Sequence, residues 1–372
     1  MIKILFFIPT LMHGGAEKVL VNLVNNMNRE EFDITVQTLF DVGVNKQYLK
    51  DDIKYKTIFK KLFRGSTTFF KLFSPELLYD KFIHDKYDIV VSYLEGATAR
   101  IVSGCPYKDT KLVSWIHTEL STAKMAAIGF RSTEECQKQY RNYDRVICVS
   151  ETVRKAFIKS IGKISEKRVK VLYNTNETEE ILEKSKEKIT DVRFDKSVVN
   201  MCSVGKIMKI KGFDRLARVH NQLLKEGYKE HIYILGIGEE QRKIERYLQE
   251  NNLVDSFTFL GYRDNPYKYV ANCDLYVCSS IREGFSTAVT ESLIVGTPVI
   301  STDCSGAKEM LGENNEYGLV VENSEEALYK GLKYILDTPQ WIGNYKKKTA
   351  ERGKYFNKSN TVIEVEKMLE EL

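Results

Sequence analysis

Short apolar runs alternate with amphipathic segments along the whole chain of 372 residues, and this alternation restricts the folds that are open to it. The runs are rich in Ile, Val and Phe, whereas the segments between them carry apolar residues at helical spacing. Strands that are apolar on both faces and are separated by helices are typical of parallel sheets covered by helices. We therefore predict an α/β protein.

The first half of the chain opens with a predicted βαβ unit. The strand at residues 3–8 leads through Gly14 and Gly15 into a helix at 16–27 and a second strand at 32–39. Further strands are expected at residues 87–93, 111–116, 145–149 and 169–173.

A second alternation follows a charged stretch at residues 177–196, where we place the domain boundary. The predicted domains span residues 1–185 and 186–350. In the second domain strands are expected at residues 198–204, 231–236, 257–260, 275–278, 298–301 and 318–321, and helices at 213–226, 241–251 and 287–295. Loops at the carboxyl ends of two such parallel sheets predict a cleft between the domains.

Composition excludes several classes of protein. The formal net charge of +5 is too small to indicate a nucleic-acid-binding protein. No apolar stretch is long enough to span a bilayer, and no signal peptide is expected. Seven scattered cysteines without a C-x-x-C pair favour reduced thiols and a cytoplasmic location.

The loop around Gly205, Lys206, Lys211 and Gly212 follows a predicted strand and opens onto a predicted helix. Helix N-terminal N–H groups together with two ammonium groups suit an anion. The alternative is a solvent-facing turn with surface lysines.

The segment from Arg282 to Glu291 also joins a strand to a helix. Ser286 or Thr287 is the expected N-cap, which would leave backbone donors for a diphosphate. Glu283 and Glu291 could then bind hydroxyl groups on either side of that anion. The alternative is that both glutamates are surface charges, since short patterns recur by chance.

Taken together, these motifs resemble those of the family 4 retaining glycosyltransferases. Glu283-Gly284-Phe285 through Glu291 matches the E-x7-E motif of that family, and Gly296-Thr297-Pro298-Val299-Ile300 resembles the segment that follows it. The resemblance covers nearly the whole chain. It implies the GT-B fold, with two Rossmann-like domains facing each other across a cleft. It also implies that a helix at residues 351–372 packs back on the acceptor-binding N-terminal domain.

The resemblance implies roles for individual residues. The donor-binding set is Gly15, Gly205, Lys206, Lys211, Tyr262, Glu283, Gly284, Phe285, Ser286, Thr287, Ala288 and Glu291. Glu283, Lys211, Lys206 and His117 form the expected catalytic set, and His13 is a weaker candidate.

Each of these roles is carried over from the family. Lys211 would contact the donor diphosphate, with Lys206 where an arginine is usual in the family. Glu283 would hold the hydroxyls of the donor sugar and Glu291 those of the ribose. His117 would reach the donor sugar.

The implied reaction is transfer of a sugar from a nucleotide-diphosphate sugar to an acceptor hydroxyl with retention of configuration. A UDP-sugar is favoured over a GDP-sugar. No cofactor is expected and, because the chain contains no D-x-D motif, no metal either.

Residues 54–73 are basic and aromatic. Ile58, Phe59, Leu62 and Phe63 would share one face of a helix, and Lys60, Lys61 and Arg64 fall outside it. Such a helix could rest on an anionic membrane surface, which predicts a lipid-linked acceptor at the inner face of the cell membrane. The alternative is a helix packed on the first domain.

Other functions fit less well. A dehydrogenase is disfavoured because Gln241 stands at the third glycine position of the dinucleotide fingerprint, and the P-loop pattern is absent. A sugar-nucleotide epimerase, a phosphorylase, or a degenerate homologue acting as a partner protein remain as alternatives.

Overall fold

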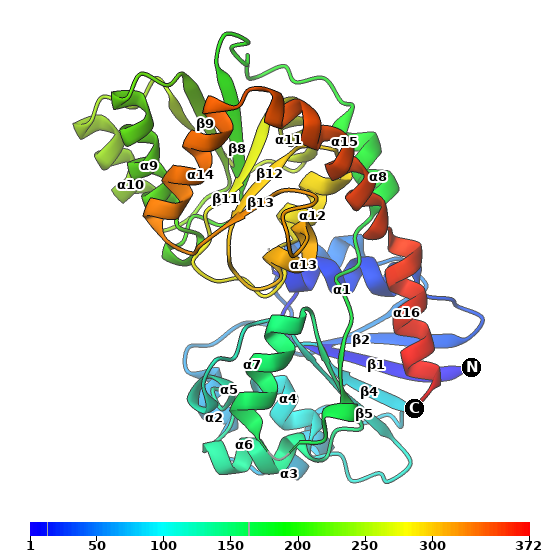
Figure 1. Cartoon of the computed structure of the whole chain (residues 1–372). Helices are drawn as coiled ribbons and strands as arrows, with labels where there is room; N and C mark the ends of the chain where they lie inside the picture. Colours follow the sequence, from blue (N-terminus) through cyan, green and yellow to red (C-terminus); the bar gives the residue numbers. More distant parts are fainter. Residues whose placement is uncertain (13, 163) are drawn as a thin grey trace. The chain divides into compact units, whose positions relative to one another are not determined.

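The chain folds into two compact units. The computed structural model describes residues 1–12, 14–162 and 164–372. Unit 1 comprises Met1–Thr175 together with Lys358–Leu372, and unit 2 comprises Asn176–Asn357. Figure 1 shows a layered arrangement of sheet and helices in each unit.

Unit 1 is built on a parallel sheet with the strand order β3-β2-β1-β4-β5-β6-β7 over its described residues. Its strands are β1 (Ile2–Ile8), β2 (Phe32–Phe40), β3 (Lys54–Phe59), β4 (Ile89–Ser92), β5 (Lys111–Ile116), β6 (Arg145–Cys148) and β7 (Val169–Val171). Its α-helices are α1 (Gly15–Asn26), α2 (Ser66–Phe70), α3 (Pro75–Phe82), α4 (Ala97–Val102), α5 (Ala123–Ala126), α6 (Thr133–Tyr140), α7 (Glu151–Ile161) and α16 (Lys358–Glu370), with 3-10 turns η1 (Val44–Tyr48) and η2 (Glu166–Arg168).

Unit 2 has a parallel sheet with the order β10-β9-β8-β11-β12-β13. Its strands are β8 (Val199–Val204), β9 (Glu230–Leu235), β10 (Phe257–Gly261), β11 (Leu275–Cys278), β12 (Val299–Thr302) and β13 (Leu319–Val321). Its helices are α8 (Thr178–Ser185), α9 (Phe213–Lys225), α10 (Gln241–Glu250), α11 (Tyr267–Asn272), α12 (Thr287–Ile294), α13 (Ala307–Leu311), α14 (Glu325–Asp337) and α15 (Gln340–Tyr355), with the 3-10 turn η3 (Lys209–Lys211).

The predicted fold class is confirmed, because both sheets are parallel and covered by helices. Strand β1 shows why: residues 4–8 are all fully buried, which is possible only with helices on both faces. Helix α9 supplies one such cover, since Leu216 and Leu223 of its apolar face lie in the core of unit 2.

In both sheets the strand order reverses beside the first strand of the unit. The reversal lies between β1 and β4 in unit 1 and between β8 and β11 in unit 2. Loops that leave neighbouring strands at such a point diverge to opposite faces of the sheet and open a crevice at their carboxyl ends. This rule directs attention to the loops after β8 and β11.

The predicted boundary at residue 185 is wrong by one helix. The charged stretch after residue 177 forms α8, whose Ile181 is buried with Tyr267 and Ile294 of unit 2. The amide of Asn265 also donates to the carbonyl of Lys184 (2.9 Å). Ile181 and this hydrogen bond join α8, which lies in the charged stretch where the boundary was predicted, to unit 2.

The C-terminal residues form two helices that belong to different units. Helix α15 reaches Tyr355 and lies against α12 in unit 2, so the predicted second domain ends too early at residue 350. Helix α16 contacts α1 in unit 1, where its Glu366 carboxylate accepts a hydrogen bond from the Asn28 N–H (2.6 Å). Val362, Val365, Met368 and Leu369 of α16 are buried. Figure 1 shows α16 alongside the strands of unit 1, with both chain termini in this unit.

The helix expected at residues 54–73 is not formed. Residues 54–59 are the edge strand β3, and the helix that follows, α2, has only five residues. Lys54 and Lys56 alternate with Tyr55 and Thr57, whose hydroxyl oxygens both hydrogen-bond to that of Thr38. This alternation has the period of two that is typical of a strand, and exposed lysines on an edge strand oppose further strand pairing.

The phenylalanines of this segment form a cluster inside unit 1. The rings of Phe59 and Phe63 lie 5.6 Å apart, and those of Phe59 and Phe70 6.0 Å apart. The first of these pairs is edge-to-face, a geometry that adds to the stability that burial provides. Phe70 is buried, whereas Phe69 is 41% exposed, so the aromatic half of the segment packs on unit 1 only in part.

Candidate functional site

The loop after β8 is brought against the loop after β11 by a glycine. Gly212 has φ +65, and a Cβ there would lie 2.2 Å from the carbonyl oxygen of Ser279. Any other residue would force the loops apart and strain the backbone. The close approach lets the Ser279 hydroxyl donate to the Lys211 carbonyl (2.9 Å).

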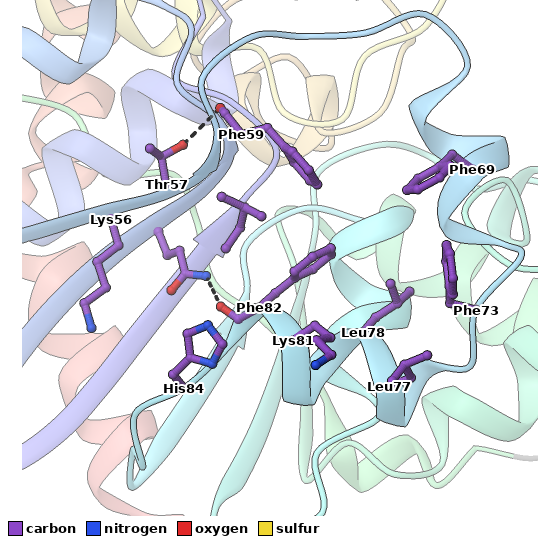
Figure 2. A pocket seen from close by; sticks show the side chains of 12 residues that line it. Lys56, Thr57, Phe59, Phe69, Phe73, Leu77, Leu78, Lys81, Phe82 and His84 are labelled. Atoms are coloured by element: carbon purple, nitrogen blue, oxygen red, sulfur yellow. Dashed lines mark hydrogen bonds between the residues drawn. The ribbon is translucent and has the colours of Figure 1, made fainter.

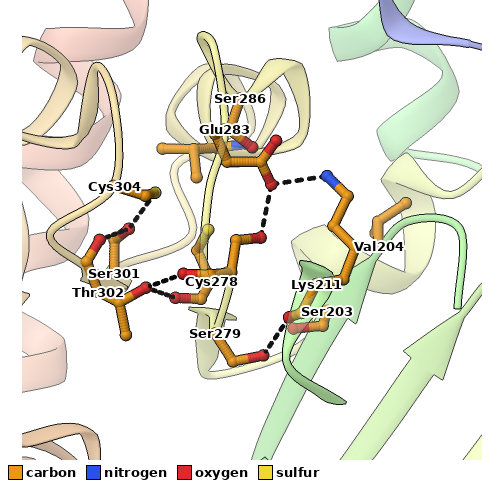
Figure 3. Close-up of polar contacts among 12 residues, drawn as sticks. Ser203, Val204, Lys211, Cys278, Ser279, Glu283, Ser286, Ser301, Thr302 and Cys304 are labelled. Carbon is orange, nitrogen blue, oxygen red and sulfur yellow. Dashed lines mark hydrogen bonds and ion pairs between the residues drawn. The ribbon is translucent and has the colours of Figure 1, made fainter. Parts of the chain in front are cut away.

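Lys211 and Glu283 form an ion pair across these two loops. Lys211 Nζ lies 2.6 Å from Glu283 Oε1, and the Ser280 hydroxyl donates to the same oxygen (2.5 Å). Figure 3 shows the side chains of Lys211 and Glu283 pointing toward each other. Their side chains are only 26% and 12% exposed for Lys211 and Glu283, so the pair is shielded from most solvent screening. The structure therefore joins the two motifs that sequence analysis identified separately.

Lys211 carries its charge at every physiological pH. Desolvation lowers the pKa of the ammonium, but the Glu283 carboxylate raises it, and the net pKa lies above the usual lysine value. The pair borders a small hollow of about 10 Å³, lined also by Val204, Phe213 and Ser286. That is room for one water molecule.

Helix α12 begins at the edge of this hollow. Its N-cap Ser286 accepts a hydrogen bond from the Val289 N–H (3.4 Å), as the sequence predicted for Ser286 or Thr287. Gly284, Thr287 and Ala288 are half-buried around the helix start, whereas Phe285 is buried and its ring packs on Phe356 (5.8 Å). The first N–H groups of a helix have no partner within it and carry its positive dipole end. An anion at this point would meet both α12 and Lys211.

Glu291 lies one helical turn further into α12. It is 8% exposed, and the Tyr267 hydroxyl lies 3.5 Å from its Oε1. It is therefore not the helix-surface carboxylate of the alternative interpretation. Burial of a carboxylate is unfavourable unless hydrogen-bonding groups surround it, which suits the binding of hydroxyls.

Three other predicted donor residues differ in their surroundings. Gly205 lies beside Lys211, since a Cβ there would be 3.5 Å from Lys211 Cε. Lys206 is exposed and makes no ion pair with any described residue. Tyr262 is 48% exposed beyond the end of β10. The structure thus gathers Gly205, Lys211, Glu283 and the start of α12, and leaves Lys206 and Tyr262 in solvent.

Arg215 was not predicted from the sequence, and it holds the loop that carries Glu283 in place. This residue of α9 is 7% exposed. Its guanidinium donates to the carbonyls of Ser279 and Ser280 (both 2.7 Å) and to the side chain of Asn323 (2.9 Å). An arginine at a core position of an amphipathic helix was the only available signal.

The two predicted residues of unit 1 lie after its own strands. Gly15 is the first residue of α1 and is exposed, whereas His13 lies outside the described residues. His117 follows β5 and its backbone N–H donates to Glu95 Oε2 (3.0 Å). His117 Nε2 is buried and finds no hydrogen-bond partner within the described part of the chain. Glu95, which follows β4, was not predicted, and desolvation raises its pKa.

Burial gives His117 a testable effect on stability. Desolvation lowers its pKa to about 3, far below its unfolded value of about 6.5. The contribution of neutral His117 to the free energy of unfolding is therefore complete above pH 6.5 and is lost as the pH falls toward 3. On unfolding between pH 6 and 4, the wild type takes up about one proton at His117, and we expect His117→Asn to abolish this uptake. Urea titrations across that range measure this slope, and the exposed His84→Asn should leave it unchanged.

The described residues contain neither a candidate metal site nor a candidate membrane-spanning helix. No group of three or more His, Cys, Asp or Glu side chains is placed to hold a metal ion. No helix within those residues has the length and apolar character needed to cross a membrane. All seven cysteines are free, in agreement with the expected reduced thiols.

Two family models match successive parts of the chain, and the division between them lies within α8. A family model described as Glycosyltransferase Family 4 matches residues 13–180, and one described as Glycosyl transferases group 1 matches residues 184–356. The two models together cover nearly the whole chain.

Curated relatives include two proteins of Campylobacter jejuni. One is N-acetylgalactosamine-N,N'-diacetylbacillosaminyl-diphospho-undecaprenol 4-alpha-N-acetylgalactosaminyltransferase, 36% identical over 197 residues. That match spans about half of each protein, 52% of this chain and 52% of the relative. The other is GalNAc-alpha-(1->4)-GalNAc-alpha-(1->3)-diNAcBac-PP-undecaprenol alpha-1,4-N-acetyl-D-galactosaminyltransferase, 25% identical over 100% of this chain and 99% of the relative.

Among solved structures, Anabaena HepE in complex with UDP-glucose has the same fold. The TM-score is 0.76 at 18% identity, with 100% of both chains covered. At this identity the match establishes the architecture alone.

Proposed function

Since the chain belongs to the family 4 glycosyltransferases with the GT-B fold, we propose that it transfers a sugar from a UDP-sugar to a hydroxyl of a lipid-linked saccharide, with retention of configuration. The product would be a longer lipid-linked saccharide for surface polysaccharide or glycoconjugate synthesis. The names of the two Campylobacter relatives, which both contain an undecaprenol-linked acceptor, support the class of acceptor.

One observation carries the proposal: the Lys211–Glu283 pair lies at the start of α12, where the strand order of unit 2 reverses. In such folds nucleotides bind at the reversal, with phosphate at a helix N-terminus. Lys211 would bind the diphosphate, and the released Glu283 carboxylate would accept hydrogen bonds from the sugar hydroxyls. Glu291, further along α12, would do the same for the ribose.

The same groups would stabilise the transition state. As the bond between the sugar and the diphosphate breaks, negative charge grows on the leaving phosphate. The Lys211 ammonium and the α12 N-terminus are fixed in advance where that charge would develop, and exposed Lys206 could add a third positive group. We propose that these groups replace a divalent metal, so that neither metal nor cofactor is required.

The surface around residues 60–72 supports a location at the inner face of the cell membrane. Leu62 and Leu72 are 54% and 71% exposed. Lys60, Lys61, Arg64 and Lys71 lie on the same segment, and none makes an ion pair with a described residue. Exposed leucines among unpaired basic groups suit the interface of an anionic bilayer.

A thermal-shift panel of UDP, GDP, ADP and CMP tests the nucleotide site. Because a ligand that binds only the folded state raises its stability, we expect UDP alone to raise Tm by several degrees near 100 times its Kd. Glu291→Ala should lose this shift, and Glu250→Ala, an exposed control on α10, should keep it.

Transfer is then measured with UDP-sugars and a diphospholipid-linked acceptor, with the anomeric configuration of the product read by NMR. A shift with GDP instead of UDP would contradict the proposed base. Turnover without an acceptor, or with inorganic phosphate as the acceptor, would instead identify an epimerase or a phosphorylase.

A further inference from the structure

Unit 1 contains a second candidate site, and no residue assigned to the donor lines it. It is a pocket of about 760 Å³ beside the edge strand β3, under the segment that contains α2 and α3. Its volume falls within the range of pockets that hold small molecules. No residue of the predicted donor or catalytic sets lines it.

The two ends of this pocket differ in chemistry. Figure 2 shows Phe69, Phe73 and Leu77 at one end, and Lys56 and His84 at the other. The apolar end offers a ligand no hydrogen-bonding side chain. The pocket is therefore amphipathic along its length.

The polar lining residues between these ends are already hydrogen-bonded. Gln37 Nε2 donates to the Phe82 carbonyl (2.7 Å), and the Thr57 hydroxyl donates to the Phe59 carbonyl (3.4 Å). A hydrocarbon chain laid along the pocket would leave none of these groups unsatisfied. A nucleotide base or a peptide would instead lose hydrogen bonds to water there.

The basic end carries net positive charge. Lys56 is paired with Asp85, and that carboxylate raises the pKa of Lys56. Lys81, in the last turn of α3, is exposed and makes no ion pair with any residue in the described part of the chain. Figure 2 shows Lys81 between the two ends of the pocket, and its charge suits a phosphate group rather than a neutral headgroup.

The wall of the pocket is held in place before any ligand binds. Arg100, only 1% exposed, donates to the carbonyls of Phe70 (3.0 Å) and Phe73 (2.8 Å). Arg131 donates to the two carbonyls between these, those of Lys71 and Leu72. A wall fixed in this way reduces the ordering cost of binding.

We propose that this pocket binds the hydrocarbon chain of a phosphate-bearing lipid. The chain lies against Phe69, Phe73 and Leu77, and the phosphate lies near Lys81. This inference rests on the proposed lipid-linked acceptor and deepens it, because it gives the lipid part of the acceptor a site within the protein. Recognition of the acceptor then depends on its chain as well as on its saccharide.

The test uses farnesyl diphosphate, farnesol and pyrophosphate as probes, titrated calorimetrically into the whole chain with UDP present. We expect farnesyl diphosphate to bind at least tenfold more tightly than farnesol or pyrophosphate. Leu77→Asp should weaken both isoprenoids at least tenfold, because it places a charge in the apolar end. Lys81→Glu should weaken farnesyl diphosphate and leave farnesol unchanged.

Each variant has a matched control. Ile128→Asp changes an exposed aliphatic residue of unit 1 that does not line the pocket, and Lys138→Glu changes an exposed lysine in the last turn of another eight-residue helix of unit 1. An unchanged UDP thermal shift in each variant shows that unit 2 is folded, and circular dichroism checks unit 1.

Failure of this inference is distinguishable from failure of the proposed function. If wild type binds no isoprenoid, or if Ile128→Asp weakens binding as much as Leu77→Asp, the pocket proposal is overturned. If farnesyl diphosphate binds as expected but no sugar is transferred to any acceptor, the proposed reaction fails and the lipid site stands.

Discussion

Lys211→Met is expected to lower kcat by about 100- to 1000-fold, the effect typical of removing one preorganised group that stabilises developing oxyanion charge. The methionine keeps most of the volume of the side chain and removes only its charge. Glu283, whose side chain is 12% exposed, would keep its hydrogen bond from Ser280 but lose its cation. The variant should also bind UDP more weakly, because the diphosphate loses its ammonium partner. Steady-state kinetics with a UDP-sugar and UDP titrations measure the two effects.

The control for this prediction lies two residues away. Lys209 belongs to the same 3-10 turn, is exposed and makes no ion pair with any described residue. Lys209→Met removes the same charge from the same loop and should leave kcat within a factor of about two. Equal losses in both variants would mean that the loop acts through its overall charge, and the specific role of Lys211 would be wrong.

Arg215→Met is expected to lower the free energy of unfolding by about 2–4 kcal/mol. Hydrogen bonds from a charged donor contribute about 1.5–3 kcal/mol each, and a buried acceptor left without a donor adds a penalty. The Ser280 carbonyl keeps a hydrogen bond from the Thr302 hydroxyl (2.6 Å), so the main loss falls on the Ser279 carbonyl. Urea unfolding followed by circular dichroism measures the change.

The same substitution should reduce activity at temperatures where the protein stays folded, since Arg215 positions the loop that carries Glu283. Arg218→Met, one turn along α9, is the control. Its guanidinium is 42% exposed and pairs with Asp214 and Glu325 at the surface, where ion pairs contribute about 0–1 kcal/mol. A stability loss in Arg218→Met as large as that in Arg215→Met would argue against a special role for the buried guanidinium.

Much of the fold could be predicted because the evidence for it is local. Residues 111–116 and 275–278 were predicted as strands with the bounds that β5 and β11 have in the structure. The same holds for the start of α12, where a serine N-cap follows a glycine turn. The loops that carry Lys211 and Glu283 were identified because a Gly-rich turn between a strand and a helix has few other structural explanations.

The errors share a physical cause, which is contact between residues distant in sequence. In β3, residues 54–59, apolar residues also fit a helical face, and only pairing with β2 makes the strand. Helix α8 belongs to unit 2 because its Ile181 packs with Tyr267 and Ile294, which lie more than 80 residues later in the sequence. Arg215 supports the site by donating to the backbone carbonyls of Ser279 and Ser280. Every residue has a backbone carbonyl, so the side chains of this loop give no sign of the contact.

Unit 1 is assembled from two separate stretches of chain, and this affects its synthesis. Val362, Val365 and Leu369 of α16 complete its core, yet they leave the ribosome only after the whole of residues 176–357. At typical elongation rates that interval is roughly 10–40 s. During it, the surface of α1 that α16 will cover is exposed to other nascent chains and to chaperones, while unit 2 can already fold. Productive folding in the cell therefore depends on protecting this one surface until translation has passed residue 369.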